Sequence, residues 1–205
     1  MSALVAVAPS DFDADAPIVA LFLHGYGSHE RDLVGLASVL PPGVPWVSLR
    51  APVDLGNGGA TWYPVVTVGR PDPVAAAEAT ATVWEWVDEH LSPTTRILPI
   101  GFSQGGLMAS QLLRTNPDRV AATVILSGFV LDAELPTDAL LADSRPPVFW
   151  GRGDLDRNFT AATIGPAAAW LRSHTDLEEH LYPGLGHSIR DDELANLRSF
   201  LARQV

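Results

Sequence analysis

The sequence contains no cysteine among its 205 residues. Disulfide bonds and cysteine-ligated zinc sites are therefore excluded, and nothing in the composition favours an oxidising compartment. Long apolar runs are also missing, since no uninterrupted stretch approaches the roughly 18 residues that a membrane-spanning helix needs. The first 16 residues lack a basic segment and contain Asp11, Asp13 and Asp15, which is unlike a secretory signal. These features predict a cytoplasmic protein.

Basic residues are few, with 13 lysines and arginines against 24 acidic residues and a net charge of −11. Such a surface repels phosphate backbones and anionic lipid headgroups, so neither nucleic acid nor stable membrane association is expected. Apolar residues make up 47% of the chain and charged residues 18%, which is typical of a globular protein. The length suits one domain spanning residues 1–205. Oligomeric state is left open by these quantities.

Short β-rich apolar runs alternate with helical patterns along the chain. This alternation predicts an α/β fold with a mostly parallel central sheet and helices on both faces. Several runs are apolar almost throughout, as expected of strands buried on both faces. The expected strands are Ala3–Val7, Ile18–Leu23, Trp46–Leu49, Arg96–Ile100, Ala122–Leu126, Val148–Trp150 and Leu177–Tyr182.

Five segments have helical spacing or capping signals. Asp72-Pro73 fits an N-cap followed by a proline at the first helical position, and apolar residues recur behind it at helical spacing up to Leu91. Other expected helices are Glu30–Leu40 after a Ser28 cap, Gly106–Arg114, roughly Pro166–His174, and a last helix opened by a Ser188–Asp191 capping box. The start of the helix near Pro166 is left open, because Gly165-Pro166 could either begin it or kink an earlier turn.

Only about twenty residues, Gly128–Pro147, separate the strand before them from the next one. A cap domain inserted here would need many tens of residues, so no substantial cap domain is expected. A pocket without such a cap would be open to water and would bury only part of a long apolar ligand.

The most informative motif is Gly101-Phe102-Ser103-Gln104-Gly105, a G-x-S-x-G pentapeptide between an apolar run and a helical segment. A sharp strand-to-helix turn holds the central serine in a strained conformation, and glycines on either side let the two backbones approach. The turn would present the Ser103 hydroxyl as a nucleophile. A bare G-x-S-x-G also fits a small-residue turn with no chemistry.

Two further loops favour the catalytic interpretation. Ile18–Leu23 is followed by a glycine-bearing loop, in which the Tyr26 N–H could form an oxyanion hole together with the N–H of Gln104. Near the C-terminus, His187 follows the last expected strand in a glycine-lined loop. The other histidines occupy expected helical, capping, strand or oxyanion-loop positions, so His187 is the candidate base.

The acid that orients this histidine should follow the strand Val148–Trp150, since α/β-hydrolases carry Ser, acid and His in that chain order. The segment Gly151–Asp156 offers Asp154 and Asp156, and spacing alone does not separate them. The aspartate that is not used would be a turn residue bonded to its own backbone.

Taken together, these segments resemble the small α/β-hydrolases grouped as carboxylesterases, lysophospholipases and acyl-protein thioesterases. The resemblance runs from about Pro17 to the C-terminus. It is carried by Phe22–Gly27, Thr61-Trp62-Tyr63, the G-F-S-Q-G-G form of Gly101–Gly106, Leu126-Ser127-Gly128, Gly151–Asp156 and Gly186-His187.

The resemblance implies an α/β-hydrolase fold and a Ser-Asp-His triad. An H-G-x-x-D acid loop in that family assigns Asp156, although Arg152 stands at the histidine position and Arg157-Asn158-Phe159 replaces a usual apolar pair and proline. The resemblance also places Trp62, and with it Tyr63, in the substrate pocket. It implies no cofactor and no metal.

The expected function is hydrolysis of carboxylic esters through an acyl-enzyme formed on Ser103, with Asp156 and His187 completing the triad. A small-molecule ester is the expected substrate. Acyl-protein thioesterase or lysophospholipase activity is the alternative within the same chemistry, and a peptidase or acyltransferase would use the same nucleophile. A ligand-binding protein without turnover is the alternative of another class, since a fold does not determine a function.

Overall fold

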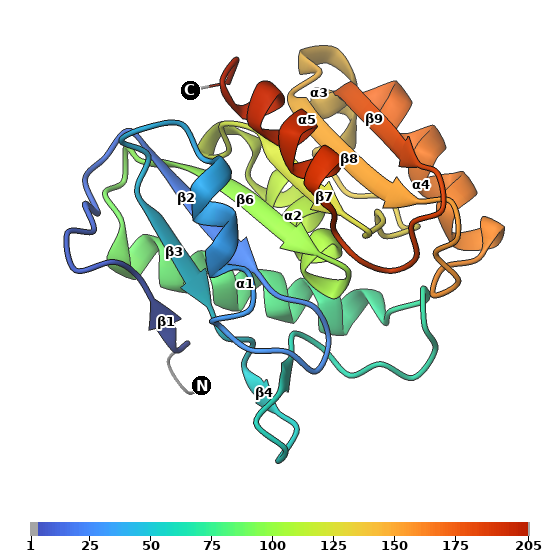
Figure 1. Cartoon of the computed structure of the whole chain (residues 1–205), viewed down its shortest axis with the longest axis horizontal. Helices are drawn as coiled ribbons and strands as arrows, with labels where there is room; N and C mark the ends of the chain where they lie inside the picture. The colour runs from blue at the N-terminus through green and yellow to red at the C-terminus, as the bar shows by residue number, and fades with distance from the viewer. Residues whose placement is uncertain (1–3, 205) are drawn as a thin grey trace.

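The computed structural model describes residues 4–204 and shows a central seven-stranded sheet (Figure 1). The strand order is β1-β3-β2-β6-β7-β8-β9, with β1 antiparallel to β3 and every other pair parallel. The strands are β1 (Ala6–Val7), β2 (Ile18–Leu23), β3 (Trp46–Leu49), β6 (Arg96–Phe102), β7 (Thr123–Leu126), β8 (Pro147–Gly153) and β9 (Asp176–Tyr182).

Each expected strand has a counterpart in this sheet, so the predicted mostly parallel α/β architecture is confirmed. The expected start at Ala3 lies outside the described residues. A short hairpin of β4 (Val53–Asp54) and β5 (Ala60–Thr61) was not expected, and the glycine-rich segment between them forms its tip.

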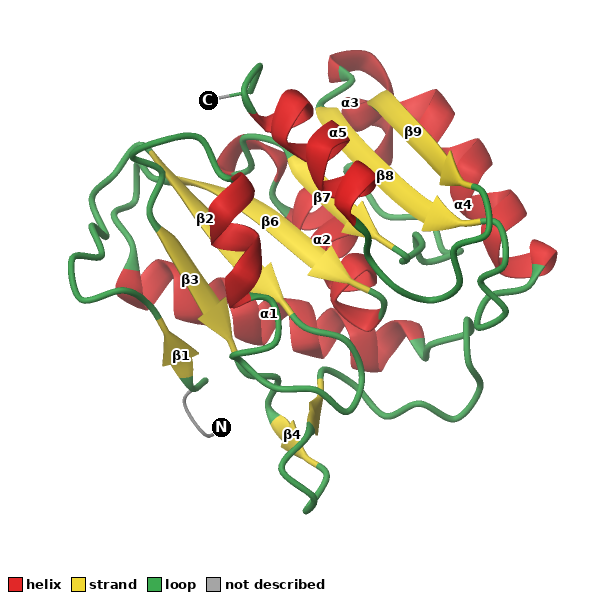
Figure 2. Ribbon diagram, viewed as in Figure 1, coloured by secondary structure: helices red, strands yellow, loops and turns green. Residues whose placement is uncertain are grey.

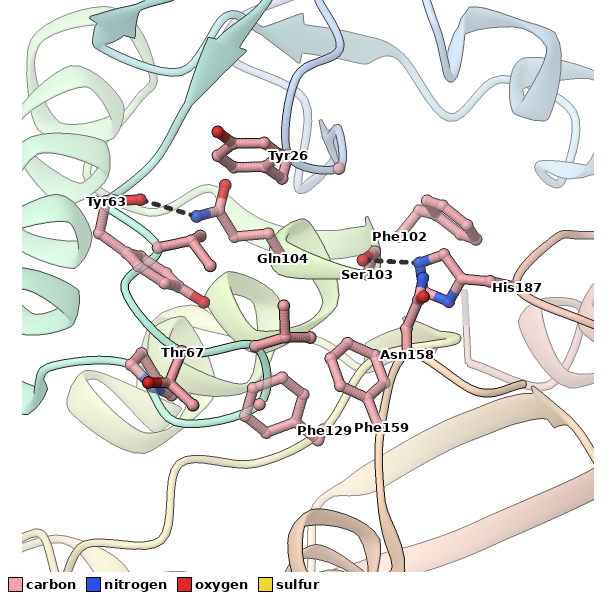
Figure 3. Close-up of a pocket in the computed structure, with 15 residues that line it drawn as sticks. Tyr26, Tyr63, Thr67, Phe102, Ser103, Gln104, Phe129, Asn158, Phe159 and His187 are labelled. Atoms are coloured by element: carbon pink, nitrogen blue, oxygen red, sulfur yellow. Dashed lines mark hydrogen bonds between the residues drawn. The ribbon is translucent and has the colours of Figure 1, made fainter.

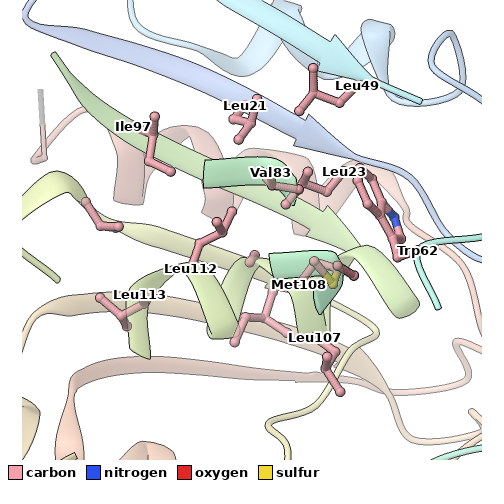
Figure 4. Packing of buried hydrophobic residues seen from close by; sticks show 14 of the residues in the cluster. Leu21, Leu23, Leu49, Trp62, Val83, Ile97, Leu107, Met108, Leu112 and Leu113 are labelled. Atoms are coloured by element: carbon pink, nitrogen blue, oxygen red, sulfur yellow. The ribbon is translucent and has the colours of Figure 1, made fainter. Parts of the chain in front are cut away.

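Helices cover both faces of the sheet (Figures 1 and 2). One face carries α1 (Pro73–His90), α2 (Gln104–Thr115) and α4 (Ala161–His174). The other face carries the 3₁₀ helix η1 (Val34–Val39) and α5 (Asp191–Leu201). Because both faces are covered, two separate apolar clusters form, one on each side. Figure 4 shows part of the larger cluster, in which Leu21 and Ile97 of the strands pack with Leu112 of α2.

Helix α1 begins as the sequence predicts. The side chain of Asp72 accepts a hydrogen bond from the Val74 N–H at 3.1 Å, and Pro73 occupies the first helical position. Helix α2 also lies where the sequence predicts one, but it starts directly after Ser103.

Three helix predictions need correction. Glu30–Leu40 is wrong, because the regular part is only η1 and the Ser28 backbone pairs with Ala60 instead of capping a helix. Helix α4 starts at Ala161, so Pro166 lies inside it. Helix α5 has Arg190 as its N-cap with no side-chain capping bond, so the Ser188–Asp191 capping box is wrong.

The connection between β7 and β8 contains a short helix, α3 (Asp138–Ser144), which the sequence analysis missed. Arg114 of α2 anchors this connection. Its guanidinium is buried, forms an ion pair with Asp138 at 2.7 Å and donates a hydrogen bond to the Leu131 carbonyl at 2.9 Å. The connection is therefore a short, anchored segment and not a separate cap. No helix within residues 4–204 combines the length and apolar character needed to cross a membrane.

The winding of the sheet fixes where a ligand site can form. From β2 the chain turns outward to β3 and then crosses back to β6, on the opposite side of β2. Open parallel sheets bind ligands at the carboxyl ends of the strands where the winding reverses. Here those ends lead into His24 after β2 and Ser103 after β6.

Helix α2 and β2 pack so closely that only glycine fits at position 105. A Cβ atom on Gly105 would lie 1.8 Å from the Leu23 carbonyl oxygen, and one on Gly101 would lie 1.9 Å from the Gly105 oxygen. These are backbone atoms and cannot move aside as a side chain could. The start of α2 therefore packs directly against the backbone of β2 and β6, with no space for a side chain at positions 101 and 105.

Replacing Gly105 with alanine should therefore destabilise the fold, because the added methyl pushes α2 away from β2. We expect a loss of more than about 3 kcal/mol in the free energy of unfolding, measured by urea denaturation. The matched control is Gly165→Ala in α4, where a Cβ meets nothing within 4 Å. There alanine should stabilise by about 0.5–1 kcal/mol. Equal stabilities of the two variants would contradict the packing described.

Candidate active site

Ser103 lies at the sharp turn between β6 and α2. Its backbone has φ 56° and ψ −115°, a conformation that residues other than glycine rarely adopt. Its N–H donates to the Leu126 carbonyl at 2.8 Å, which ties the strained residue to β7. The turn has the geometry that the G-x-S-x-G motif predicts, and it points a hydroxyl out of the strand end.

A continuous hydrogen-bonded chain links Ser103 to a histidine and a carboxylate. His187 Nε2 lies 2.8 Å from Ser103 Oγ (Figure 3). His187 Nδ1 lies 2.7 Å from Asp156 Oδ2. The Asp156 carboxylate accepts a hydrogen bond from the Nδ1–H of His187, so the ring proton stays on Nδ1 and Nε2 keeps the lone pair that faces the serine hydroxyl. The three residues come from three loops, after β6, β8 and β9.

The two aspartates of the acid loop have different partners. Asp156 contacts His187, and its second carboxylate oxygen accepts from the Asn158 N–H at 3.0 Å. Asp154 instead accepts from the Gly184 N–H at 2.7 Å, which joins the acid loop to the loop that leads to His187. Of these two aspartates, Asp156 is therefore the one whose carboxylate bonds to the imidazole of His187.

His24 is fully buried below the loop that follows β2. Its Nε2 accepts from the Ala51 N–H at 3.0 Å, so the remaining proton is on Nδ1, which donates to the Gly25 carbonyl at 2.7 Å. Burial lowers the pKa of His24, in agreement with a neutral ring. The Gly25 carbonyl and the Tyr26 N–H belong to one planar trans peptide and point in opposite directions. Anchoring the carbonyl on His24 therefore turns the Tyr26 N–H away from the buried ring.

The side chain of Gln104 has a role that the sequence analysis did not foresee. It is buried, and its carbonyl accepts from the Trp62 N–H at 3.0 Å while its amide donates to the Tyr63 carbonyl at 2.9 Å. The Trp62 indole in turn donates to the His24 carbonyl at 2.9 Å. Gln104 thus holds the Trp62-Tyr63 segment in place, and Trp62 in turn bonds to the loop after β2. The G-F-S-Q-G-G form was the available signal, but it does not reveal these partners.

A cavity of about 390 Å³ opens next to Ser103. Figure 3 shows Tyr63 and Thr67 on the side of Ser103 remote from His187, with Phe129 and Phe159 forming another wall. The lining residues are Gly25, Tyr26, Tyr63, Val65, Thr67, Val68, Gly69, Pro71, Phe102, Ser103, Gln104, Phe129, Asn158, Phe159 and His187.

Tyr63 therefore lines the pocket as expected, but Trp62 does not. Trp62 is buried beneath the lining, where its indole bonds to the His24 carbonyl. The described residues contain no group of three or more histidine, aspartate or glutamate side chains arranged to hold a metal ion.

Comparisons with known proteins agree with this geometry. The phospholipase/carboxylesterase family matches residues 6–205 of the chain. Carboxylesterase SOBER1 of Arabidopsis thaliana is 28% identical, with 90% of each chain covered. Acyl-protein thioesterase 1 of Debaryomyces hansenii is 26% identical over 78% of this chain and 73% of its own. The carboxylesterase of Bacillus cereus superposes with a TM-score of 0.80 at 21% identity, covering 98% of this chain and 95% of its own, which confirms the α/β-hydrolase fold.

A buried carboxyl group lies behind the loop that carries His187. Glu193, in the first turn of α5, is fully buried, and neither of its side-chain oxygens makes a hydrogen bond. One oxygen lies 2.1 Å from where a Cβ on Gly151 would be, so the carboxyl group occupies space left by that glycine. Burial raises the pKa of Glu193 to about 7, and the nearby charge of Asp192 adds to the rise.

This shift predicts a specific dependence of stability on pH. The folded protein holds the Glu193 proton more tightly than the unfolded chain, so the folded state loses stability as pH rises from about 4.5 to about 7. The loss is on the order of 3 kcal/mol. In Glu193→Gln the side chain at this position cannot ionise, so the variant does not lose this stability. The difference in the free energy of unfolding, variant minus parent, should therefore increase by this amount between pH 4.5 and pH 8.

Chemical denaturation at several pH values measures this difference in the free energy of unfolding. Replacing the carboxyl group with an amide can also change stability by a pH-independent amount, but that amount does not affect the trend with pH. Glu89→Gln, at an exposed position on α1, is the control and should show no such trend. A flat difference for Glu193→Gln would mean that the buried carboxyl titrates near its usual pKa.

Proposed function

Because the chain belongs to the phospholipase/carboxylesterase family, we propose that it hydrolyses carboxylic esters through an acyl-enzyme formed on Ser103. The observation that carries the proposal is the hydrogen-bonded chain from Ser103 through His187 to Asp156, which opens onto an apolar cavity. A serine hydroxyl is a weak nucleophile unless a base takes its proton, and His187 Nε2 is within reach to do so.

In the first half of the reaction, Ser103 Oγ attacks the ester carbonyl carbon as its proton passes to His187 Nε2. The carbonyl oxygen becomes an oxyanion in a tetrahedral intermediate. His187 then gives its proton to the alcohol oxygen, the bond to that oxygen breaks, and the alcohol leaves an acyl-Ser103. Asp156 stabilises the imidazolium and holds the ring in the required tautomer.

In the second half, water takes the place of the alcohol. It loses a proton to His187 Nε2 and attacks the acyl carbon, and collapse of the second intermediate returns the proton to Ser103 Oγ. A carboxylic acid is released. Atoms and electrons balance without any further reactant, so the chemistry uses only side chains, backbone groups and water.

The Tyr26 and Gln104 N–H groups are the proposed donors to the oxyanion. Gln104 is the first residue of α2, so its N–H has no acceptor within the helix and is near the positive end of the helix dipole. Tyr26 N–H is oriented through the His24 contact with Gly25. Each donor of this kind contributes about 3 kcal/mol of transition-state stabilisation.

The pocket favours an uncharged substrate near the reacting ester. Among residues 4–204, no aspartate, glutamate or arginine lines it, and the walls are mainly aromatic and aliphatic. A thioester would react by the same route with a thiol as the leaving group, and one relative is named an acyl-protein thioesterase. A lysophospholipid would have to hold its charged headgroup outside this cavity. A measurement of product release distinguishes these enzymes from a ligand-binding protein, because a protein without turnover releases no product.

Ser103→Ala should fold normally and lose nearly all ester hydrolysis, because the nucleophile is missing while the packing glycines remain. A fluorophosphonate probe should label the parent protein and leave this variant unlabelled. Turnover of nitrophenyl esters and circular dichroism provide the activity and folding measurements. Labelling of another serine in the variant would reject Ser103 as the nucleophile.

Replacing each acid-loop aspartate with asparagine separates their proposed roles. Asp156→Asn should lower kcat by about 10³–10⁴, because an amide stabilises the wrong tautomer of His187. Asp154→Asn keeps an oxygen that can accept from the Gly184 N–H, so kcat should change by less than about ten-fold. Larger impairment of the Asp154 variant would mean that the acid loop adopts a different register in solution.

A further inference from the structure

A second cavity lies beside the pocket, and one aromatic ring separates the two. The second cavity has a volume of about 250 Å³. Its lining residues are Ser127, Gly128, Arg152, Gly153, Asp154, Asp156, Phe159, Ala161 and Ile164. Within the described chain, Phe159 is the only residue that lines both this cavity and the pocket at Ser103.

The Phe159 ring is held between two other rings. It packs edge-on against His187, with ring centroids 5.6 Å apart and planes at 76°, and tilted against Phe129 at 4.8 Å and 57°. Both arrangements are favourable geometries for aromatic pairs. Figure 3 shows Phe129 and Phe159 side by side along one wall, with Ser103 above Phe159.

The position of this ring follows from the turn that holds Asp156. The second oxygen of Asp156 accepts from the Asn158 N–H, which closes a tight turn and delivers Phe159 to the wall one residue later. The same loop therefore supplies both the carboxylate for His187 and the wall of the pocket. This is also the stretch, Arg157–Phe159, in which the sequence departs from the family pattern.

The pocket at this wall fits the acyl part of an ester. His187 must give its proton to the leaving alcohol, so the alcohol lies on the His187 side of the reacting carbon. The acyl group then extends to the opposite side, toward Tyr63 and Thr67, where the cavity has its volume (Figure 3). Phe129 and Phe159 line one wall of the cavity, and Phe159, which contacts both Phe129 and His187, is the part of that wall nearest the reacting carbon.

We propose that Phe159 sets the size limit for the acyl group, by closing the pocket against the second cavity. The inference rests on the proposed ester hydrolysis at Ser103. With the ring in place, the cavity of about 390 Å³ is near the small end of ligand pockets, so it selects short to medium unbranched acyl groups. Removing the ring joins the two cavities and admits longer or branched acyl groups.

The test compares Phe159→Ala with the parent on two series of nitrophenyl and alkyl esters. One series varies the acyl group from acetyl to dodecanoyl and includes a pivaloyl ester, with the alcohol constant. The other varies the alcohol on a constant acetyl group. We expect the ratio of kcat/KM for dodecanoyl or pivaloyl over butanoyl to rise at least roughly ten-fold in the variant, with the alcohol series unchanged.

Two further variants guard against indirect effects. Phe159→Leu keeps an apolar wall and should retain most of the parent's selectivity, even if the alanine variant loses activity on every ester through a displaced His187. Arg157→Ala changes an exposed neighbour that lines neither cavity and should leave both series as in the parent. An unchanged acyl profile in the alanine variant, or a shift in the alcohol series instead, would overturn the proposal.

Stoichiometric labelling separates this proposal from the proposed function. Nitrophenyl alkylphosphonates of graded chain length react once with the serine and need no turnover. If the parent labels at Ser103 but hydrolyses no ester, the function fails while the labelling rates still report the size limit. If the ratio of labelling rates for long-chain over short-chain reagents is higher in Phe159→Ala than in the parent, the proposed role of Phe159 in limiting acyl size is supported. Equal rate profiles for variant and parent reject it.

Discussion

The contact of α2 with β2 and β6 is the constraint on which the site depends. Backbone approaches of this closeness leave no room for a Cβ at Gly101 or Gly105, and the strained Ser103 lies between them. The strain persists because the surrounding sheet and helix hold the turn on both sides, with the Ser103 N–H also bonded to β7. The position of the hydroxyl is therefore fixed by backbone packing and not by its own side-chain contacts.

A buried polar network extends this rigidity to the loop after β2. The Gln104 side chain accepts from the Trp62 N–H, and the Trp62 indole donates to the His24 carbonyl. The His24 ring bonds to the Gly25 carbonyl and the Ala51 N–H, and all three side chains are buried. Hydrogen bonds of this kind are worth little in net energy, but leaving any of them unmade is costly in a buried place. The network thus has one arrangement that satisfies its members, and that arrangement sets the orientation of the Gly25–Tyr26 peptide.

A buried carboxyl group near the site makes the stability of the fold depend on pH. Glu193, in the helix that follows the His187 loop, is most compatible with the fold when it is protonated. Glu193 occupies space next to Gly151 on β8, and the chain continues from there to Asp156. The buried carboxyl group thus packs against the strand that leads into the acid loop, and it couples the stability of the fold to pH.

Much of this protein follows from the sequence alone. Apolar runs bounded by turn residues located the strands of the sheet, because strands buried on both faces have a strong local signature. Ser103 and His187 could be selected because their chain order and glycine neighbours reflect local backbone requirements. The helix at Glu30–Leu40 and the capping box at Ser188 were wrong, since Ser28 pairs with the distant Ala60 and α5 starts only after Arg190, with no side-chain cap.

Only the tertiary structure decided what depends on residues far apart in the chain. Asp154 and Asp156 are two residues apart and chemically identical, and their different partners, Gly184 and His187, are determined by how two loops meet. The burial of Trp62 beneath the pocket, the clamp made by the Gln104 side chain and the wall formed by Phe159 have the same origin. A sequence specifies such contacts only through the whole fold, because a side chain's partners are set by packing and not by its neighbours along the chain.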